Sequence, residues 1–295
     1  MPETMVANAK APKIKKSSEF LRIMKQLSYN KLAMFGLILF IVELILCFSA
    51  PLIAPYGYND LNIMDMNQAP NAAHWFGTDE LGRDILSRIL YGGRYSISMG
   101  VSAIIIAMLV GMFIGSLAGY FGGWVDNILM RILDVVQSLP GMLLTIVISA
   151  VLGPGFFNTI LALSVNAIPH QARMLRAQIL KIRNSEYIEA AQSINCSKAT
   201  IILDHLIPNS MSPMIVQASM GVANQIIMAS SLSFIGLGVQ PPAPEWGAML
   251  SGSRQYIRNY PHMVIFPGLA IAVTVLSLNL LGDGLRDAMD PRLRR

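Results

Sequence analysis

The stretch YSISMGVSAIIIAMLVGMFIGSLAGY, residues 95–120, contains no Asp, Glu, Lys or Arg. A helix needs about 20 apolar residues to cross the hydrocarbon core of a bilayer, and this stretch is long enough. Residues 213–235 and 263–281 are uncharged runs of similar length. Runs of this length rarely occur as core helices of a soluble protein. The sequence therefore predicts an integral membrane protein.

Three further apolar spans contain a few polar residues. Residues 32–54 hold one acid, Glu43, which is costly in lipid and should face protein or water. Residues 128–152 are charged only near their start, and residues 156–170 are followed by a polar stretch. Over the whole chain 13% of residues are charged, compared with roughly 25% in an ordinary soluble domain. We therefore expect an all-α integral membrane protein with six transmembrane helices.

The basic residues indicate how these spans are oriented. In a six-span arrangement, 17 of the 22 Lys and Arg residues lie before the first span, at the start of the third, between the fourth and fifth, or after the sixth. Cytoplasmic segments of membrane proteins are enriched in Lys and Arg, so that side is predicted to be the cytoplasm. Both termini should then be cytoplasmic. The net charge of +5 reflects this topology, and we expect no nucleic-acid partner.

The spans divide the chain into five parts. We expect a cytoplasmic tail, a first transmembrane anchor helix, an extracytoplasmic loop, a transmembrane core and a second cytoplasmic tail, at residues 1–30, 31–54, 55–94, 95–285 and 286–295. Near the end of the loop, residues 84–92 favour a short amphipathic helix. Pro140 and Pro169 each remove a backbone hydrogen bond from a span and predict kinks.

Polar side chains inside the spans are candidates for the lining of a transport pathway. These residues are Gln137, Asn166, Asn224 and Gln225. Hydrogen bonding between helices explains the last two nearly as well. Asp134 follows Arg131 by three residues, a spacing that allows an ion pair on one helix.

The cytoplasmic connection 183–209 contains a short helical pattern, SEYIEAAQSIN, at residues 185–195. Ser185 can serve as the N-cap, and Glu186 and Glu189 suit the positive end of the helix dipole. Asn195 can adopt the left-handed conformation that often ends a helix. A helix this short is unstable alone in water, so the rest of the protein or a partner must hold it.

Several motifs resemble those of a known family. Glu189-Ala190-Ala191, followed by Asn195 and His205-Leu206-Ile207-Pro208-Asn209, resembles the "EAA" loop of ATP-binding-cassette (ABC) importer permeases, which usually has Gly where this chain has Asn195. Three further stretches resemble the dipeptide, oligopeptide and nickel branch of that family: HWFGTDELGRDILSRILYG (74–92), LSFIGLGVQPPAPEWGAML (232–250) and FPGLAIAVTVLSLNLLGDGLRDAMDPRLR (266–294). The resemblance runs from about residue 30 to the end of the chain.

This resemblance implies a type I ABC importer permease core in the cytoplasmic (inner) membrane of a bacterium. Such a subunit forms part of a pore for di- and oligopeptides. Glutathione, nickel or another small solute is an alternative cargo. The implied partners are a second homologous permease, two cytoplasmic ATPase subunits and an extracytoplasmic binding protein. The connection would form a coupling helix that docks on the ATPase, through Glu186, Tyr187, Glu189, Ala190, Ala191, Asn195, His205 and Pro208.

The chain has no visible means of using ATP itself. None of its eight lysines follows a glycine, so it contains no Gly-Lys-Ser/Thr phosphate loop. We expect ATP and magnesium to be bound by the partner ATPase subunits, with no cofactor in this chain. Its four histidines are scattered without ligand spacing, so we expect no metal site.

Two other functional classes fit the sequence less well. An ion-coupled secondary transporter usually has paired charged residues deep in the membrane, and only Glu43 and Asp134 come near that pattern. An intramembrane enzyme needs a catalytic pair such as Ser and His on facing spans, and no convincing pair is visible. We therefore expect a transport subunit that is not an enzyme.

Two sets of residues in the predicted outer segments each allow two interpretations. Asp79, Arg83 and Asp84 could form a salt-bridge and turn cluster, or they could contact an incoming binding protein. Glu245 and Trp246 present the same choice, and Trp246 is equally compatible with an anchor at the membrane interface.

Overall fold

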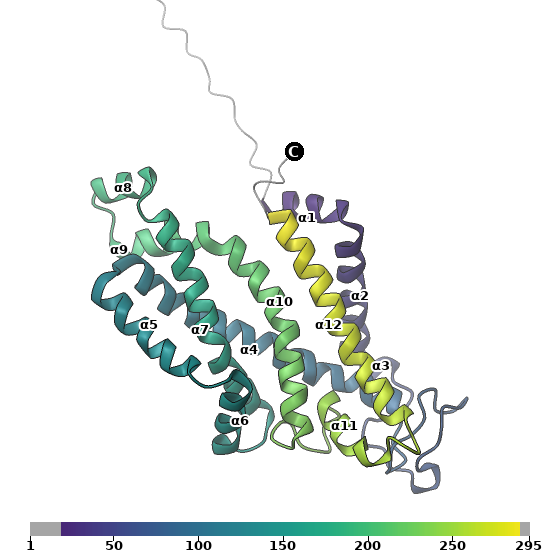
Figure 1. Ribbon diagram of the computed structural model, residues 1–295. Coiled ribbons are helices and arrows are strands. Elements are labelled where there is room, and N and C mark those ends of the chain that lie inside the picture. Colours follow the sequence, from purple (N-terminus) through teal and green to yellow (C-terminus); the bar gives the residue numbers. More distant parts are fainter. Residues whose placement is uncertain (1–18, 290–295) are drawn as a thin grey trace, which may run out of the picture.

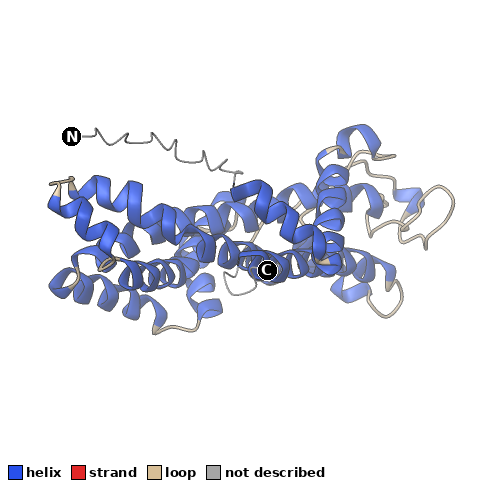
Figure 2. Cartoon of the chain, turned by 90° about the horizontal axis from the view of Figure 1, so that it is seen from above, coloured by secondary structure: helices blue, strands red, loops and turns tan. Residues whose placement is uncertain are grey.

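The computed structural model describes the backbone of residues 19–289, and side chains from Met24 onward. Most of the two predicted tails, residues 1–18 and 290–295, therefore lies outside the described residues. Figure 2 shows that the described part of the chain is built from helices joined by loops, without a strand. This confirms the all-α fold class.

Seven helices form the body of the molecule. They are α2 (Lys31–Phe48), α4 (Ile85–Phe121), α5 (Gly123–Gln137), α6 (Gly141–Leu152), α7 (Phe156–Ile182), α10 (Ile207–Phe234) and α12 (His262–Met289). Shorter helices connect or flank them. These are α1 (Glu19–Tyr29), α3 (Ala50–Ile53), η1 (Ile63–Asp65), α8 (Glu186–Ser193), α9 (Lys198–Thr200), the π-helical η2 (Ile201–Leu206), α11 (Trp246–Ser253) and η3 (Arg254–Tyr256).

Four helical segments are long and apolar enough to cross a membrane. They are α2, α4, α12 and the continuous run from α9 through η2 to α10. The pair α5 and α6 passes the same test together but is bent by 83°, so the number of spans by length and composition is four or five. α7 is also long, but its second half carries Arg173 and Arg176. The expectation of six spans stays a prediction.

The two prolines predicted to kink their helices behave differently. At Pro140 the chain stops being helical, because α5 ends at Gln137 and Pro140 becomes the N-cap of α6. The expected span at 128–152 therefore consists of two helices bent by 83° at this break, and whether they cross the membrane as one span stays a prediction. Pro169, in contrast, lies inside α7, which continues on both sides of it.

The predicted amphipathic helix at 84–92 does not exist as a separate element. It forms the first turns of α4, whose N-cap is Asp84. The Asp84 carboxylate accepts a 2.8 Å hydrogen bond from the Ser87 backbone N–H, which satisfies one of the free donors at the helix start. The irregular part of the predicted loop 55–94 thus ends at Asp84, and a single helix of 37 residues runs from it into the core.

The core depends on a close crossing of α4 and α7. Gly111, Gly115 and Gly119 lie one turn apart on α4 and face α7. A β-carbon added at Gly115 would lie 2.4 Å from the backbone oxygen of Ala172. Small residues at this spacing let two membrane helices approach backbone to backbone.

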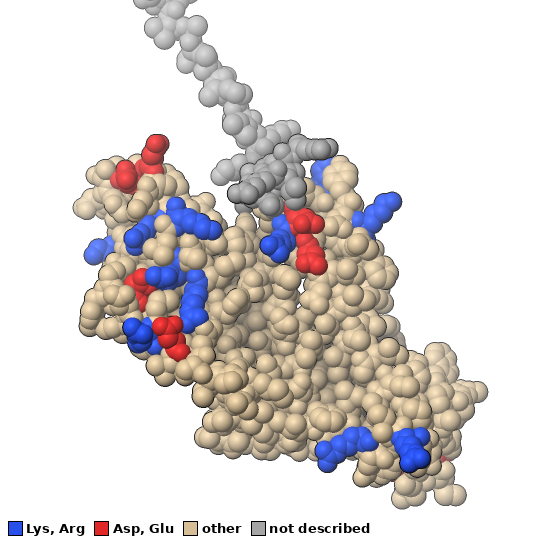
Figure 3. Space-filling view, viewed as in Figure 1, with Lys and Arg blue, Asp and Glu red and all other residues tan. Residues whose placement is uncertain are grey.

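The two ends of the molecule carry different elements. α1, the end of α12 and α8 lie at one end, whereas α3, α6 and α11 lie at the other (Figure 1). Figure 3 shows most of the visible Lys and Arg side chains towards the α8 end, with two smaller groups at the opposite end. This distribution agrees with the predicted cytoplasmic position of both termini and of the 183–209 connection.

Candidate functional site

α8 projects from the molecule at the end of α7 (Figure 1). Ser185 is its N-cap residue, as predicted, and the two acids Glu186 and Glu189 stand in its first turn. The predicted capping hydrogen bond is absent, because the Ser185 hydroxyl donates instead to the backbone oxygen of Ile182 at 2.6 Å. The Ser185 hydroxyl therefore binds a free carbonyl at the end of α7. At the start of α8, the positive end of the helix dipole is stabilised by the two acidic residues instead.

Two side chains of α8 attach it to the body of the protein. Ile188 and Ala191 are buried in a hydrophobic cluster to which α7, η2 and α10 all contribute. The other buried members of this cluster are Leu175, Ile179, Ile201, Ile202, Leu206 and Met214. Movement of α8 would therefore be transmitted to three helices through one apolar contact.

Asn195 ends the helical segment in the left-handed conformation. Its φ is +60°, and its backbone N–H donates to the oxygen of Gln192 at 2.9 Å. The next residue, Cys196, donates to the oxygen of Ala191 at 3.0 Å. These two bonds satisfy carbonyl groups that a helix end leaves free. The prediction of a left-handed stop is confirmed.

The opposite face of α8 is open to solvent. Glu186, Tyr187, Glu189 and Ala190 are exposed, and Ile194 keeps 77% of its surface accessible. Of the remaining predicted coupling residues, Asn195 and Pro208 are exposed, His205 is partly buried and Ala191 is buried.

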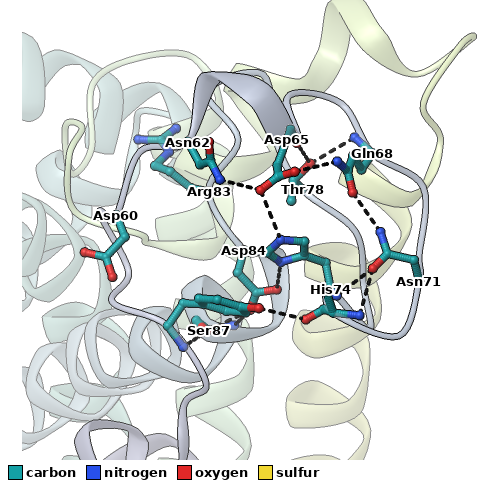
Figure 4. A network of polar contacts seen from close by, with 12 residues as sticks. Asp60, Asn62, Asp65, Gln68, Asn71, His74, Thr78, Arg83, Asp84 and Ser87 are labelled. Atoms are coloured by element: carbon teal, nitrogen blue, oxygen red, sulfur yellow. Dashed lines mark hydrogen bonds and ion pairs between the residues drawn. The ribbon is translucent and has the colours of Figure 1, made fainter.

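At the other end of the molecule, the loop before α4 is held by a polar network (Figure 4). Arg83 donates through Nε to the Asp79 carboxylate at 2.7 Å, and Asp79 also accepts the Arg83 backbone N–H at 3.0 Å. The Asp84 carboxylate lies 2.9 Å from Nδ1 of His74. The interpretation of these residues as a salt-bridge and turn cluster is confirmed.

The same geometry contradicts the alternative role of this cluster. Asp79, Arg83 and Asp84 are all buried, and their polar atoms are engaged by one another and by neighbouring residues. Their side chains cannot contact an incoming binding protein in this conformation. They instead fold the loop against the start of α4.

Glu245 and Trp246 are also buried completely, so neither a contact with a binding protein nor an anchor at the membrane interface fits them. The Glu245 carboxylate caps α11 by accepting from the Ala248 N–H at 2.8 Å, and it accepts from the Ser96 hydroxyl at 3.0 Å. The Trp246 indole donates to the oxygen of Ile89 at 3.0 Å. Burial raises the pKa of the Glu245 carboxyl. The pair joins α11 to α4.

Comparison with known proteins gives the family. Residues 111–295 match "Binding-protein-dependent transport system inner membrane component", and residues 18–70 match "N-terminal TM domain of oligopeptide transport permease C". The chain belongs to this permease family. It is an inner-membrane, multi-pass subunit of an ABC importer.

Similar proteins include permeases with two kinds of named cargo. The permease is 43% identical over 270 residues to the dipeptide transport system permease protein DppC of Alkalihalophilus pseudofirmus, covering 92% of this chain and 89% of that one. It is 48% identical over 264 residues to the glutathione transport system permease protein GsiD of Shigella flexneri serotype 5b, covering 89% and 87% of the two chains.

Solved structures agree on the fold. The permease matches an inward-facing conformation of the MetNI methionine ABC transporter with a TM-score of 0.57 at 17% identity, over 69% of this chain and 97% of that chain. It matches an amino acid ABC transporter with a TM-score of 0.53 at 17% identity, over 67% and 92% of the two chains. The core architecture of type I importer permeases is thus shared.

No hydrogen bond within the described chain joins the predicted pathway residues of the permease to one another. Gln137 is exposed at the end of α5 and accepts a hydrogen bond from Arg173. Asn166 is partly buried on α7. On α10, Asn224 is exposed, whereas Gln225 is buried and its side-chain oxygen has no partner among the described residues. Their role as pathway lining stays a prediction.

A hollow that sequence reasoning missed lies between α7, α10 and the end of α12. Its volume is about 360 Å³, and its lining from α10 includes Ser212, Pro213, Val216, Gln217 and Met220. It opens towards the end of the permease that carries α8, where Figure 3 shows a recess in the surface. The small and polar residues of SMSPMIVQ could have indicated it, because a lipid-facing helix needs neither.

Two ion pairs join α5 to α7. Asp134 pairs with Arg173 at 2.7 Å, so the predicted pair with Arg131 on the same helix is wrong. Arg176 binds both oxygens of Asp126 at 2.5 Å. Glu43 faces protein as expected, because it accepts a hydrogen bond from the Thr274 hydroxyl of α12.

Proposed function

We propose that this permease is one of two pore-forming subunits of an importer for short peptides, driven by ATP that separate subunits hydrolyse. A second homologous permease, two cytoplasmic ATPases and an extracytoplasmic binding protein would complete the complex. ATP and magnesium would be bound by the ATPases, and this chain would not be an enzyme. α8 carries the proposal, because it presents a free outer face while its inner face is fixed to three helices.

The exposed face of α8 has the chemistry of a docking surface. Tyr187 and Ile194 offer apolar area, and Glu186 and Glu189 add two negative charges beside it. An isoleucine exposed to water contributes nothing to stability, whereas its burial in the core of a protein–protein interface contributes favourable free energy to binding. We propose that an ATPase subunit covers this face and that its closure moves α8.

The cargo proposal rests on the named relatives. One is a dipeptide permease and another is a glutathione permease, at similar identity to this chain. Glutathione is itself a short peptide, so we propose short peptides as the cargo class and glutathione as a second candidate. Competition between labelled dipeptide and glutathione for uptake by proteoliposomes containing the full complex separates the two.

The docking role is tested by reversing the charge of Glu189. Glu189→Lys, and separately Ala191→Pro, should abolish ATP-driven peptide uptake while the permease still inserts in the membrane. The lysine repels whatever basic surface meets α8, and the proline breaks its backbone. Uptake is measured with labelled peptide in proteoliposomes, and insertion by membrane fractionation.

A matched control reverses a charge at the far end of the molecule. Arg258 is exposed and lies beyond α11, so Arg258→Glu should leave uptake unchanged. Normal uptake by Glu189→Lys would reject α8 as the docking helix, whatever the cargo proves to be.

A further inference from the structure

Arg94 stands out among the arginines of the described chain. It lies on α4, partly withdrawn from solvent, yet it forms no ion pair and no hydrogen bond with any described residue. The other partly or fully buried arginines between residues 24 and 289 are all engaged, namely Arg83, Arg88, Arg173, Arg176 and Arg183. A guanidinium that is partly shielded from water gains from a charge-assisted hydrogen bond to an oxyanion, and none of the described residues supplies one to Arg94.

Arg94 lines a cavity of about 340 Å³. Three tyrosines share this cavity with it, Tyr58, Tyr91 and Tyr95, and no hydrogen bond engages their hydroxyl groups within the described chain. No acidic residue lines the cavity. This volume is large enough for a carboxylate or a phosphodiester group.

Aromatic rings surround the cation. The Phe48 ring centroid lies 6.0 Å from the guanidinium carbon, a contact that adds only a weak attraction. Tyr58 stacks obliquely on Tyr91 at 5.2 Å, and Tyr95 meets Phe156 edge to face at 5.9 Å. These contacts hold the rings in place and so fix the shape of the cavity before any ligand arrives.

The cavity lies where three helices reach the end of the molecule opposite α8. Phe48 ends α2, Tyr91 and Arg94 belong to the first turns of α4, and Phe156 begins α7. Phe157, which follows Phe156 in α7, is largely exposed, which suits contact with lipid tails. The mouth is therefore expected at the outer boundary between hydrocarbon and water.

We propose that this cavity is a binding site for a singly charged oxyanion, held by Arg94 and the tyrosine hydroxyls. A planar guanidinium donates in parallel to two oxygens of a carboxylate or phosphodiester, and a phenol donates one further bond. One unpaired cation matches one negative charge. Two sources carry this chemistry: the headgroup of an acidic phospholipid in the outer leaflet, or a carboxylate of the transported solute.

The first arm tests the lipid source on the complete transporter complex. Native mass spectrometry measures how many phosphatidylglycerol molecules remain bound after titration with that lipid, for wild type, R94Q, R94K and R258Q. We expect roughly tenfold weaker binding for R94Q, about 1.4 kcal/mol, and a smaller loss for R94K, which keeps the charge without the two-pronged geometry. R258Q removes an equally basic but exposed side chain and should match wild type.

The second arm tests the solute source in proteoliposomes of phosphatidylcholine alone. Uptake of a dipeptide with a free carboxylate is compared with uptake of its C-terminal amide. If the solute supplies the anion, R94Q raises KM for the free acid roughly tenfold and leaves KM for the amide unchanged. Weaker lipid binding in the first experiment or a raised KM in the second supports the site. Which of the two is observed shows whether the lipid or the solute supplies the anion.

Two outcomes overturn the proposal. One is equal behaviour of R94Q and wild type in both arms. The other is loss of the permease pair on size-exclusion chromatography in R94Q alone, which would assign Arg94 to a carboxylate of the neighbouring subunit. Y91F serves where R94Q fails to assemble, because it removes one hydroxyl and keeps the stacking on Tyr58; unchanged affinity in both R94K and Y91F would equally reject the site.

Discussion

At the scale of single residues, Asn195 shows how one backbone angle defines a functional element. Its left-handed conformation ends the α8 segment and turns the chain back towards η2. A residue with a β-carbon pays about 1–2 kcal/mol for that conformation, and asparagine pays less than most. The position therefore constrains residue type although its side chain is exposed.

Substitution of Asn195 should follow this backbone cost. Asn195→Gly should keep or slightly raise the thermal stability of the permease, whereas Asn195→Val should lower it, because a β-branched side chain fits the left-handed region worst. Peptide uptake should rank in the same order. Scanning fluorimetry and uptake assays on both variants check this, and equal behaviour of the two would contradict the assignment.

Glu245 makes stability depend on pH. Its pKa is raised in the folded protein by burial, so the folded state holds its proton to a higher pH than the unfolded chain does. Its contribution to stability is then fully present below the pKa of the unfolded state and is lost as pH rises through the higher folded value. We expect the melting temperature of wild type to fall as pH is raised above the ordinary titration range of a carboxyl group.

Glu245→Gln should remove this part of the pH dependence. The amide oxygen can still accept from the Ala248 N–H, and no proton is left to lose. The melting curve of the variant should be flatter with pH than that of wild type. Glu245→Ala should instead lower stability at every pH by about 1 kcal/mol or more, because the α11 cap is gone.

At the scale of elements, local and long-range features differ in how well sequence predicts them. α8 and its stop were predicted because Glu186, Glu189 and Asn195 act on their own backbone. The roles of Glu245 and Asp134 were not, because their partners, Ser96 and Arg173, lie far away in sequence. The break at Pro140 was predicted as a kink, but its size depends on how α5 and α6 pack on α7.

The close crossing of α4 and α7 is indicated in the sequence by the spacing of three glycines. The letters GMFIGSLAG at residues 111–119 place glycine at every fourth position, a recognised signal for close helix approach in membranes. The same residues also belong to an uncharged hydrophobic span, which is the more prominent pattern. Reading glycine spacing within a span would have predicted which face of α4 meets a neighbour.

Adding one methyl group at this crossing should be costly. Gly115→Ala forces a β-carbon against the backbone oxygen of Ala172, and we expect a loss of about 1–3 kcal/mol with a lower melting temperature. Gly268→Ala is the matched control, because Gly268 lies in α12 with no atom within 4 Å of the added carbon. The control should be neutral or slightly stabilising. A similar loss in both variants would contradict the assignment, because nothing lies within 4 Å of the carbon added at Gly268 and alanine is the better helix former.

At the scale of the whole molecule, the two ends are predicted to face different compartments. Met64 in η1 is 90% exposed at the loop end, and Ile194 is exposed at the α8 end. In a Cys196→Ser background, Met64→Cys should react with a membrane-impermeant maleimide on intact spheroplasts. Ile194→Cys should react only after permeabilisation. Labelling in the reverse order would invert the orientation deduced from the basic residues.

The π-helical turn at Ile201–Leu206 gives the molecule a way to change the phase of α10. A π-turn accommodates one residue more than an α-turn, and each residue of an α-helix corresponds to about 100° of rotation. Tightening that turn would rotate α10 about its own axis relative to α9 without unwinding either. Because α8 packs on η2 through Ile188 and Ala191, a displacement of α8 acts directly on this turn and would change which face α10 presents to its neighbours.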